Sequence, residues 1–311
     1  MFDRGRGGFA RGAACWLGVR IGRDQASCFG IHVADYAPQY MVTTGSRVSP
    51  RLNLGHGTYT TGGQARRWLA GLWPSLAFYS RILFIVFRAS AKARQGIYDD
   101  AAWSASSLET IRALEHVGAR LDISGLDHVA ALEGPCLFIG NHMSTLETFV
   151  LPVLLVPFKR ITFVVKQSLV EYPVFGHVMR SRDPITVGRT NPRDDLKSVL
   201  EGGAERLAKG ISIVIFPQTT RTAAFDPKEF NTIGVKLAKR ASVPVIPFAL
   251  KTDAWGNGRL HKDFGRIDLS KTVHFAFGAP LRIADRGSEG HRAIIRFISA
   301  HLTEWGGMVK R

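Results

Sequence analysis

The feature that most constrains the fold is the alternation of short apolar segments with longer amphipathic ones from Asp99 onward. Short runs rich in Val, Ile and Phe indicate buried strands, while Asp99 and Pro192 stand where helices are expected to begin. Strands that alternate with helices imply crossover connections and parallel pairing. We therefore predict an α/β fold with a mixed, largely parallel central sheet flanked by helices. The expected strands cover residues 121–124, 135–140, 161–166, 185–187, 211–216, 245–250 and 273–277, and the expected helices cover residues 99–117, 144–156, 192–209, 230–240 and 289–304.

Ahead of this region, residues 68–87 read WLAGLWPSLAFYSRILFIVF, which is about the length of a membrane span. Pro74 interrupts the segment and Arg81 lies inside its apolar part. A charge near the bilayer centre costs roughly 2.5–3.5 kcal/mol on insertion scales. We therefore predict that residues 66–98 form an apolar helical membrane anchor, monotopic or re-entrant, with Arg81 near lipid phosphates. A helix buried in the core is the alternative.

Residues 1–65 are rich in Gly, Arg, Ser and Thr and show no sustained period. This composition predicts a disordered basic leader, with an incorrectly chosen start of the sequence as the alternative. Residues 99–311 are then the α/β domain. The cysteines are Cys15, Cys28 and Cys136, an odd number without metal-site spacing. They predict a reducing compartment and no structural disulfide.

The formal net charge of +16 is the strongest feature of the composition. A basic surface suits nucleic acid, anionic lipid or an acidic protein, although solubility alone could also account for it. The sequence has no zinc-finger spacing and no aromatic RNA-binding signature, so nucleic acid is not an expected partner. Cations that flank residues 68–87 favour the anionic cytoplasmic face of the inner membrane, with peripheral or monotopic attachment.

The segment most informative about chemistry is GNHMSTLE, residues 140–147. His142 directly follows an apolar strand, and the carboxyl ends of strands are where open α/β sheets place reactive groups. Histidine can take a proton from a hydroxyl near neutral pH, and a carboxylate on its other ring nitrogen fixes the tautomer. Glu147 is placed to be that carboxylate. Ser144 and Glu147 also form a capping box, so a purely structural role for Glu147 stays open.

Two further segments share this arrangement. The sequence FPQTTRT, residues 216–222, follows an apolar strand and includes Arg221, whose planar guanidinium suits phosphate. A polar loop with a solvated arginine is the alternative. The sequence VPVIP, residues 243–247, opens another strand, and its internal proline implies an edge or irregular strand.

Taken in order, these segments resemble the glycerolipid acyltransferase family typified by the 1-acyl-glycerol-3-phosphate acyltransferases. Residues 141–147 match the family block N-H-x-S-x-x-D, with Glu147 in place of Asp. The segment PITVGR ending at Arg189 resembles the second block, and FPQTTRT resembles the third, F-P-E-G-T-R-S. Residues 243–247 match the fourth block, V-P-V-I-P. The resemblance covers roughly residues 68–285.

The resemblance implies an O-acyltransferase that moves a fatty acyl group from an acyl thioester to the hydroxyl of a lysophospholipid such as 1-acyl-glycerol-3-phosphate. His142 would be the general base and Glu147 its orienting carboxylate. Arg189 and Arg221, with Lys166, would hold the acceptor's phosphate. The complete set of expected substrate contacts is Asn141, Ser144, Lys166, Arg189, Gln218, Thr219, Thr220 and Arg221.

The same resemblance implies no acyl-enzyme, no metal and no cofactor, because acyl-CoA or acyl carrier protein serves as co-substrate. Membrane lipids are expected partners, and the oligomeric state stays open. Gln218 and Thr219 stand where the family has Glu and Gly, which points to an acceptor other than lysophosphatidate. A non-catalytic or divergent lipid-binding protein of the same fold is the alternative function.

Overall fold

The computed structural model describes residues 50–62, 73–218, 220–258, 262–284 and 286–310, all of which belong to one compact unit, residues 40–311. The strands are β1 (Tyr59–Thr60), β2 (Arg120–Ser124), β3 (Leu137–Gly140), β4 (Ile161–Lys166), β5 (Ile185–Val187), β6 (Ser212–Ile215), β7 (Ala224–Phe225), β8 (Val245–Lys251), β9 (Thr272–Phe277) and β10 (Met308–Val309). The helices are α2 (Pro74–Arg94), α3 (Asp100–Val117), α4 (Leu126–Ala131), α5 (Leu146–Leu155), α6 (Gln167–Val170), α7 (Phe175–Arg180), α8 (Pro192–Ala208), α9 (Ile233–Ala241) and α10 (Ser288–Glu304).

The central sheet has eight strands in the order β1-β2-β9-β8-β3-β6-β4-β5. The pairs β1–β2 and β8–β9 are antiparallel, and the other neighbouring pairs of this sheet are parallel. The predicted mixed, largely parallel sheet is therefore confirmed. Strands β8, β3, β6, β4 and β5 all run in one direction, so their carboxyl ends lie along one edge of the sheet.

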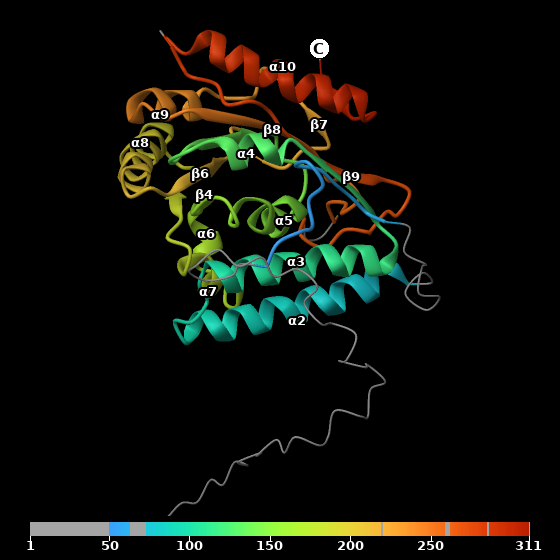
Figure 1. The fold of residues 1–311 in the computed structure, drawn as a ribbon. Helices are drawn as coiled ribbons and strands as arrows, with labels where there is room; N and C mark the ends of the chain where they lie inside the picture. The colour runs from blue at the N-terminus through green and yellow to red at the C-terminus, as the bar shows by residue number, and fades with distance from the viewer. Residues whose placement is uncertain (1–49, 63–72, 219, 259–261, 285, 311) are drawn as a thin grey trace, which may run out of the picture. The chain divides into compact units, whose positions relative to one another are not determined.

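Helices cover both faces of the sheet (Figure 1). Helix α10 packs on β8, and α9 packs on β3 and on α8. On the other side, α5 packs against α3, and α3 packs against α2. The centre of the sheet lies in the core, since all four residues of β3 and all four residues of β6 are buried.

Local sequence explains where several helices begin and end. The side chain of Asp99 accepts a hydrogen bond from the Ala102 N–H and caps α3, as the sequence predicts. Gly118 follows α3 at φ 94°, a left-handed conformation that glycine adopts without strain. Pro74 occupies the first position of α2, where its missing N–H costs nothing.

The described part of the predicted membrane anchor is residues 73–98, most of which form helix α2; residues 63–72 lie outside the described residues. The helix begins at Pro74 and continues to Arg94, beyond the end of the apolar segment at residue 87. Arg81 contacts His116 of α3 at 3.1 Å between Nη2 and Nε2, and its predicted position near lipid phosphates stays a prediction. In the described residues, no helix combines the length and apolarity that a membrane crossing would require.

The predicted leader, residues 1–65, is wrong over residues 50–62. Strand β1 pairs with β2, and the side chain of Leu52 is buried. Tyr59 and Thr61 donate hydrogen bonds to the carboxylate of Glu115 at 2.5 and 2.8 Å. Leader residues 1–49 and 63–65 lie outside the described residues.

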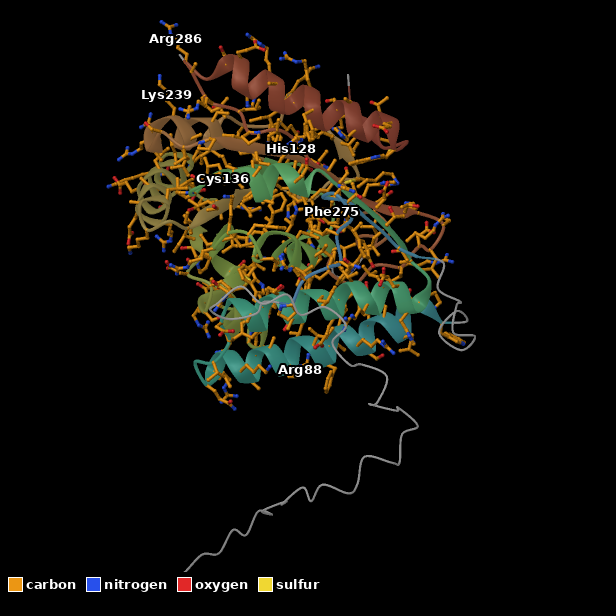
Figure 2. All side chains as sticks on the ribbon, in the orientation of Figure 1. Arg88, His128, Cys136, Lys239, Phe275 and Arg286 are labelled. Atoms are coloured by element: carbon orange, nitrogen blue, oxygen red, sulfur yellow. The ribbon has the colours of Figure 1, made fainter. Side chains whose placement is uncertain are left out.

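Cys136, which directly precedes β3, is a free cysteine in the core, and burial raises the pKa of its thiol to about 11. A neutral buried thiol of this kind acts as a small apolar side chain. Figure 2 shows Cys136 and Phe275 inside the domain and Lys239 on the outer side of α9. Cys15 and Cys28 lie outside the described residues.

Candidate active site

The predicted reactive residues gather along the edge of the sheet where the five parallel strands end. His142 follows β3, Gln218 follows β6 and Thr252 follows β8. Lys166 ends β4, and Arg189 follows β5. Parallel strand direction therefore brings together side chains that are far apart in the sequence, such as His142 and Thr252, as this class of sheet requires.

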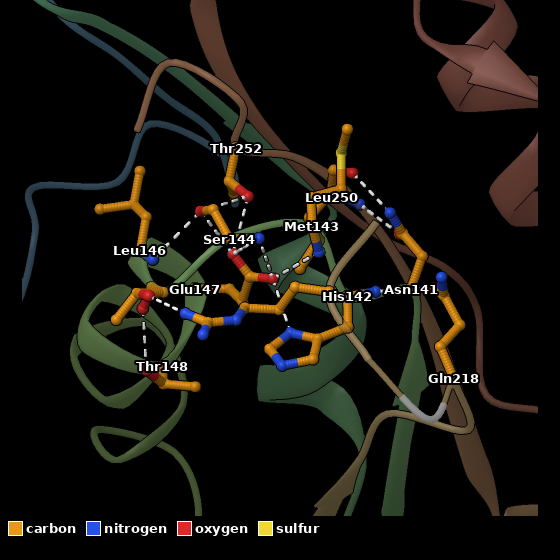
Figure 3. A network of polar contacts seen from close by, with 12 residues as sticks. Asn141, His142, Met143, Ser144, Leu146, Glu147, Thr148, Gln218, Leu250 and Thr252 are labelled. Atoms are coloured by element: carbon orange, nitrogen blue, oxygen red, sulfur yellow. Dashed lines mark hydrogen bonds and ion pairs between the residues drawn. The ribbon is translucent and has the colours of Figure 1, made fainter. Parts of the chain in front are cut away.

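His142 and Glu147 form a hydrogen-bonded pair (Figure 3). The distance from His142 Nδ1 to Glu147 Oε1 is 2.8 Å, and Glu147 is fully buried. Because an ionised carboxylate only accepts hydrogen bonds, Nδ1 carries the proton and Nε2 keeps its lone pair. The side chain of His142 is 17% exposed and lines a cavity, which leaves room for a substrate hydroxyl beside the ring.

Glu147 also fulfils the alternative structural role at the start of α5, because its carboxylate accepts hydrogen bonds from main-chain N–H groups. Oε1 accepts from the Met143 N–H at 2.7 Å and from the Ser144 N–H at 2.9 Å. Oε2 accepts from the hydroxyls of Ser144 at 3.0 Å and Thr252 at 2.7 Å. Burial alone would raise the pKa of Glu147, but the hydrogen bond and charge of His142, together with these donors, lower it below its ordinary value.

The third-block residues hold the main chain of His142 from both sides. Gln218 Oε1 accepts from the His142 N–H at 2.8 Å, and the Thr222 N–H donates to the His142 carbonyl at 3.1 Å. Gln218 Nε2 donates to Thr222 Oγ1 at 2.8 Å, which links the two contacts. The Phe216 ring stacks on the imidazole with 4.4 Å between the ring centroids. Gln218 is therefore placed to position His142.

Two predicted substrate contacts are buried and have structural partners instead. The Asn141 amide exchanges hydrogen bonds with the Leu250 main chain at 2.8 and 2.9 Å, and 1% of the residue is exposed. Ser144 is equally buried and bonds to Glu147 and Thr252. Both side chains therefore have partners within the protein, and their contact with substrate stays a prediction.

A cavity of about 600 Å³ opens beside His142. Its wall is mostly apolar and is formed by residues of α2, α3, α5, α6, α7, α8 and α9 and of strands β4, β5 and β6. The apolar residues include Ile85, Phe149, Phe163, Val165, Leu169, Phe175, Val178 and Met179. Three exposed cations, Lys166, Arg189 and Lys236, line the same cavity as His142. An apolar chain with an anionic group near one end fits such a lining.

Arg221 is not among the lining residues of this cavity. It forms an ion pair with Asp263 at 2.6 Å and donates to the hydroxyl of Thr145. Lys166 and Arg189 thus line the cavity while Arg221 is paired with Asp263, and the prediction that all three hold one phosphate stays a prediction. Thr220 is exposed and accepts from Lys262 at 3.3 Å, while Thr219 lies outside the described residues.

Sequence reasoning missed Thr252 and Asp263. Thr252 is detectable in principle, since it follows an apolar strand as His142 does. Asp263 carries no such signal, because it lies in the long connection between β8 and β9. Across the described residues, no group of three or more His, Cys, Asp or Glu side chains could hold a metal ion.

Comparison with known proteins agrees with this geometry. Residues 120–251 match the family model described as Acyltransferase. A 1-acyl-sn-glycerol-3-phosphate acyltransferase of Pseudomonas aeruginosa is 35% identical over 132 residues, which are 42% of this chain and 49% of that protein. A chloroplastic 1-acyl-sn-glycerol-3-phosphate acyltransferase of Arabidopsis thaliana is 28% identical over 160 residues, covering 50% of this chain and 44% of the relative. The chain thus spans about half the length of these curated relatives.

The fold is also similar to a solved structure. The crystal structure of the 1-acyl-sn-glycerophosphate acyltransferase PlsC from Thermotoga maritima superposes with a TM-score of 0.55 and 17% sequence identity. The superposition covers 76% of this chain and 96% of that chain. At this identity the likeness concerns the fold.

Proposed function

Since this chain belongs to the PlsC-like acyltransferase family through residues 120–251, we propose that it transfers a fatty acyl group from an acyl thioester to the hydroxyl of a lysophospholipid. The observation that carries this proposal is the His142–Glu147 pair beside a large apolar cavity. The cavity is large enough for an acyl chain, and the cations Lys166, Arg189 and Lys236 suit an anionic group of either substrate.

In the proposed reaction, Nε2 of His142 takes the proton of the acceptor hydroxyl as its oxygen attacks the thioester carbonyl carbon. The tetrahedral intermediate collapses, the carbon–sulfur bond breaks, and His142 returns the proton to the leaving thiolate. The products are the ester and the free thiol. Glu147 stabilises the imidazolium in between, and no acyl-enzyme or cofactor is required. CoA and acyl carrier protein both provide such a thioester, and either serves as the proposed donor.

The test is a transfer assay with purified protein, a radiolabelled acyl thioester and lyso-lipids presented in mixed micelles. The panel includes lysophosphatidate and its phosphodiester relatives, with both CoA and carrier-protein thioesters as donors. We expect a diacyl product, identified by mass, and stoichiometric release of thiol. A protein that binds these lipids but forms no product with any donor would contradict the proposal and favour the lipid-binding alternative.

We further propose that α2 attaches the enzyme to the surface of a membrane. One side of this helix packs against α3 and α7, and its buried residues include Phe78, Ile82 and Ile85. Several large apolar side chains of α2 and its start remain exposed, namely Trp73, Leu76, Leu83, Phe84 and Phe87. A helix with one face packed on protein and an exposed apolar face suits insertion into the headgroup region. The cytoplasmic face of the inner membrane is the proposed location, because Lys92 and Arg94 add basic charge at the end of the helix.

The double substitution Phe84→Ser and Phe87→Ser is expected to weaken binding to anionic vesicles about ten-fold or more, because two aromatic rings no longer leave water. Sedimentation with vesicles of phosphatidylglycerol and phosphatidylethanolamine measures this binding. Met308→Ser on β10 is the matched control. Met308 is about equally exposed, but β10 pairs with β7 and is far from α2 in the sequence. Equal vesicle binding of the double variant and the control would refute the role of α2.

A further inference from the structure

We propose that Asp263 is a specificity-determining residue that disfavours acceptors with a dianionic phosphomonoester head group. It does so by occupying Arg221, the arginine of the third block. This inference rests on the proposed acyl transfer and concerns the choice of acceptor within it. Asp263 lies outside the four sequence blocks on which the family resemblance rests.

The carboxylate of Asp263 sits where two donors converge. Arg221 Nη1 lies 2.6 Å from Asp263 Oδ1, and the hydroxyl of Thr145 donates to the same oxygen at 3.0 Å. Arg221 also donates to Thr145 Oγ1. A guanidinium and a hydroxyl directed at one oxygen are an anion-binding arrangement. Asp263 therefore fills a small anion site with a group from the chain itself.

This anion site is next to the reactive residues. Thr145 lies three positions after His142, at the start of α5, and Arg221 directly precedes Thr222, whose N–H bonds to the His142 carbonyl. These contacts place the Arg221–Asp263 pair beside the chain segment that carries His142, and we take this pair to be where the head group of the acceptor binds. Its phosphate and the Asp263 carboxylate compete for the same guanidinium.

Hydrogen bonds hold the main chain at Asp263 and in the residues just after it. Trp255 Nε1 donates to the Asp263 main-chain carbonyl at 3.0 Å. The Tyr79 hydroxyl donates to the Gly265 carbonyl at 2.5 Å, and the Ile267 N–H donates to Ser75 Oγ at 3.0 Å. These contacts fix the main chain to α2 and to the aromatic residue Trp255, so the carboxylate is held beside Arg221 independently of its own ion pair.

The charges decide which head groups are favoured. Arg221 is 18% exposed and Asp263 38% exposed, so their interaction is only partly screened by water. A phosphomonoester carries close to two negative charges and is repelled by the remaining carboxylate, whereas a phosphodiester carries one negative charge. A zwitterionic diester also offers an ammonium that the carboxylate can bind. Asp263 therefore favours phosphodiester lysophospholipids over lysophosphatidate.

The test compares Asp263→Asn with the wild-type protein on lysophosphatidate and on lysophosphatidylethanolamine in the transfer assay. Asparagine keeps the size and the main-chain contacts but removes the charge. We expect the KM for lysophosphatidate to fall about ten-fold with kcat little changed, while the KM for the phosphodiester stays constant or rises. In an Arg221→Ala background the effect of Asp263→Asn is expected to be smaller, because the competition for the guanidinium is absent and only the direct repulsion by the carboxylate remains.

Glu133→Gln removes the same charge at an exposed position before β3, at the end of the sheet opposite His142, and is the matched control. It is expected to leave the ratio of the two KM values unchanged. An unchanged ratio in Asp263→Asn, or an equal loss of activity on both acceptors, would overturn the proposal and make Asp263 a structural partner of Arg221. A wild-type protein without transfer to any acceptor would instead refute the proposed function.

Discussion

The His142→Ala variant is expected to lose acyl transfer almost completely, with kcat reduced by about 10²–10⁴-fold. Nε2 of His142 is the proposed proton acceptor, because Nδ1 is committed to Glu147 at 2.8 Å. Water can replace a missing base only poorly in a site lined by apolar side chains. The KM for the thioester is expected to change little, since the acyl chain contacts the cavity wall instead of the imidazole.

Initial rates of thiol release at saturating donor and acceptor measure this effect. His128→Ala is the control, because the His128 side chain on α4 is 40% exposed and is not among the residues that line the cavity, so its removal is expected to leave kcat unchanged. Thermal unfolding must show that both variants remain folded. If His142→Ala keeps its full rate in the purified state, the general-base mechanism is wrong.

Much of the fold could be predicted from the sequence because its strands are short, apolar and separated by helix signals. The regions around β3, β4, β8 and β9 lie close to the predicted ranges, since a fully buried strand reads as a continuous apolar run. Strand β1 could not be predicted in this way. It has only two residues, and its pairing with β2 depends on a partner some sixty positions away in the sequence.

The candidate site was likewise only partly predictable from the sequence. His142 and Glu147 are local in sequence, so their five-residue spacing already places the two side chains near one another. Gln218 illustrates what a local pattern misses. Its residue type suggested a change in the acceptor pocket, and Gln218 does line the cavity; the pattern missed that its amide oxygen also accepts from the His142 N–H. Which polar group faces the substrate depends on loop geometry between strands that are far apart in sequence.

The same limitation applies to Arg221. A motif identifies an arginine after a strand, but the partner of that arginine comes from another part of the chain. Asp263 reaches Arg221 from the connection between β8 and β9 and carries no pattern of its own. An ion pair of this kind becomes visible only in three dimensions.

Glu147→Gln is expected to be the second most damaging substitution, with a loss in kcat of about 10³-fold, whereas Glu147→Asp retains more activity. Glutamine removes the charge that stabilises the imidazolium and turns an amide NH2 toward N–H and O–H donors. Aspartate keeps the charge but is one methylene shorter, so some of the present contacts lengthen. Rates of thiol release for the three proteins measure the order.

The dependence of protein stability on pH shows whether the charge of Glu147 contributes to the fold. The folded-state pKa of Glu147 lies below its ordinary value of 4.5, which an unfolded chain restores. Its carboxylate therefore stabilises the wild-type protein fully above about pH 4.5, and this contribution is lost as the pH falls through the folded-state pKa. His142 is the titratable group that faces it.

Glu147→Gln lacks this ionisation, so the difference in Tm between wild type and variant is expected to be largest near neutral pH and to shrink in acid. Thermal unfolding from pH 3.5 to 7 measures it. A difference that stays constant over this range would mean that Glu147 contributes shape and hydrogen bonds but no charge. The carboxylate would then not stabilise an imidazolium at His142, and the proposed pairing would fail together with the mechanism built on it.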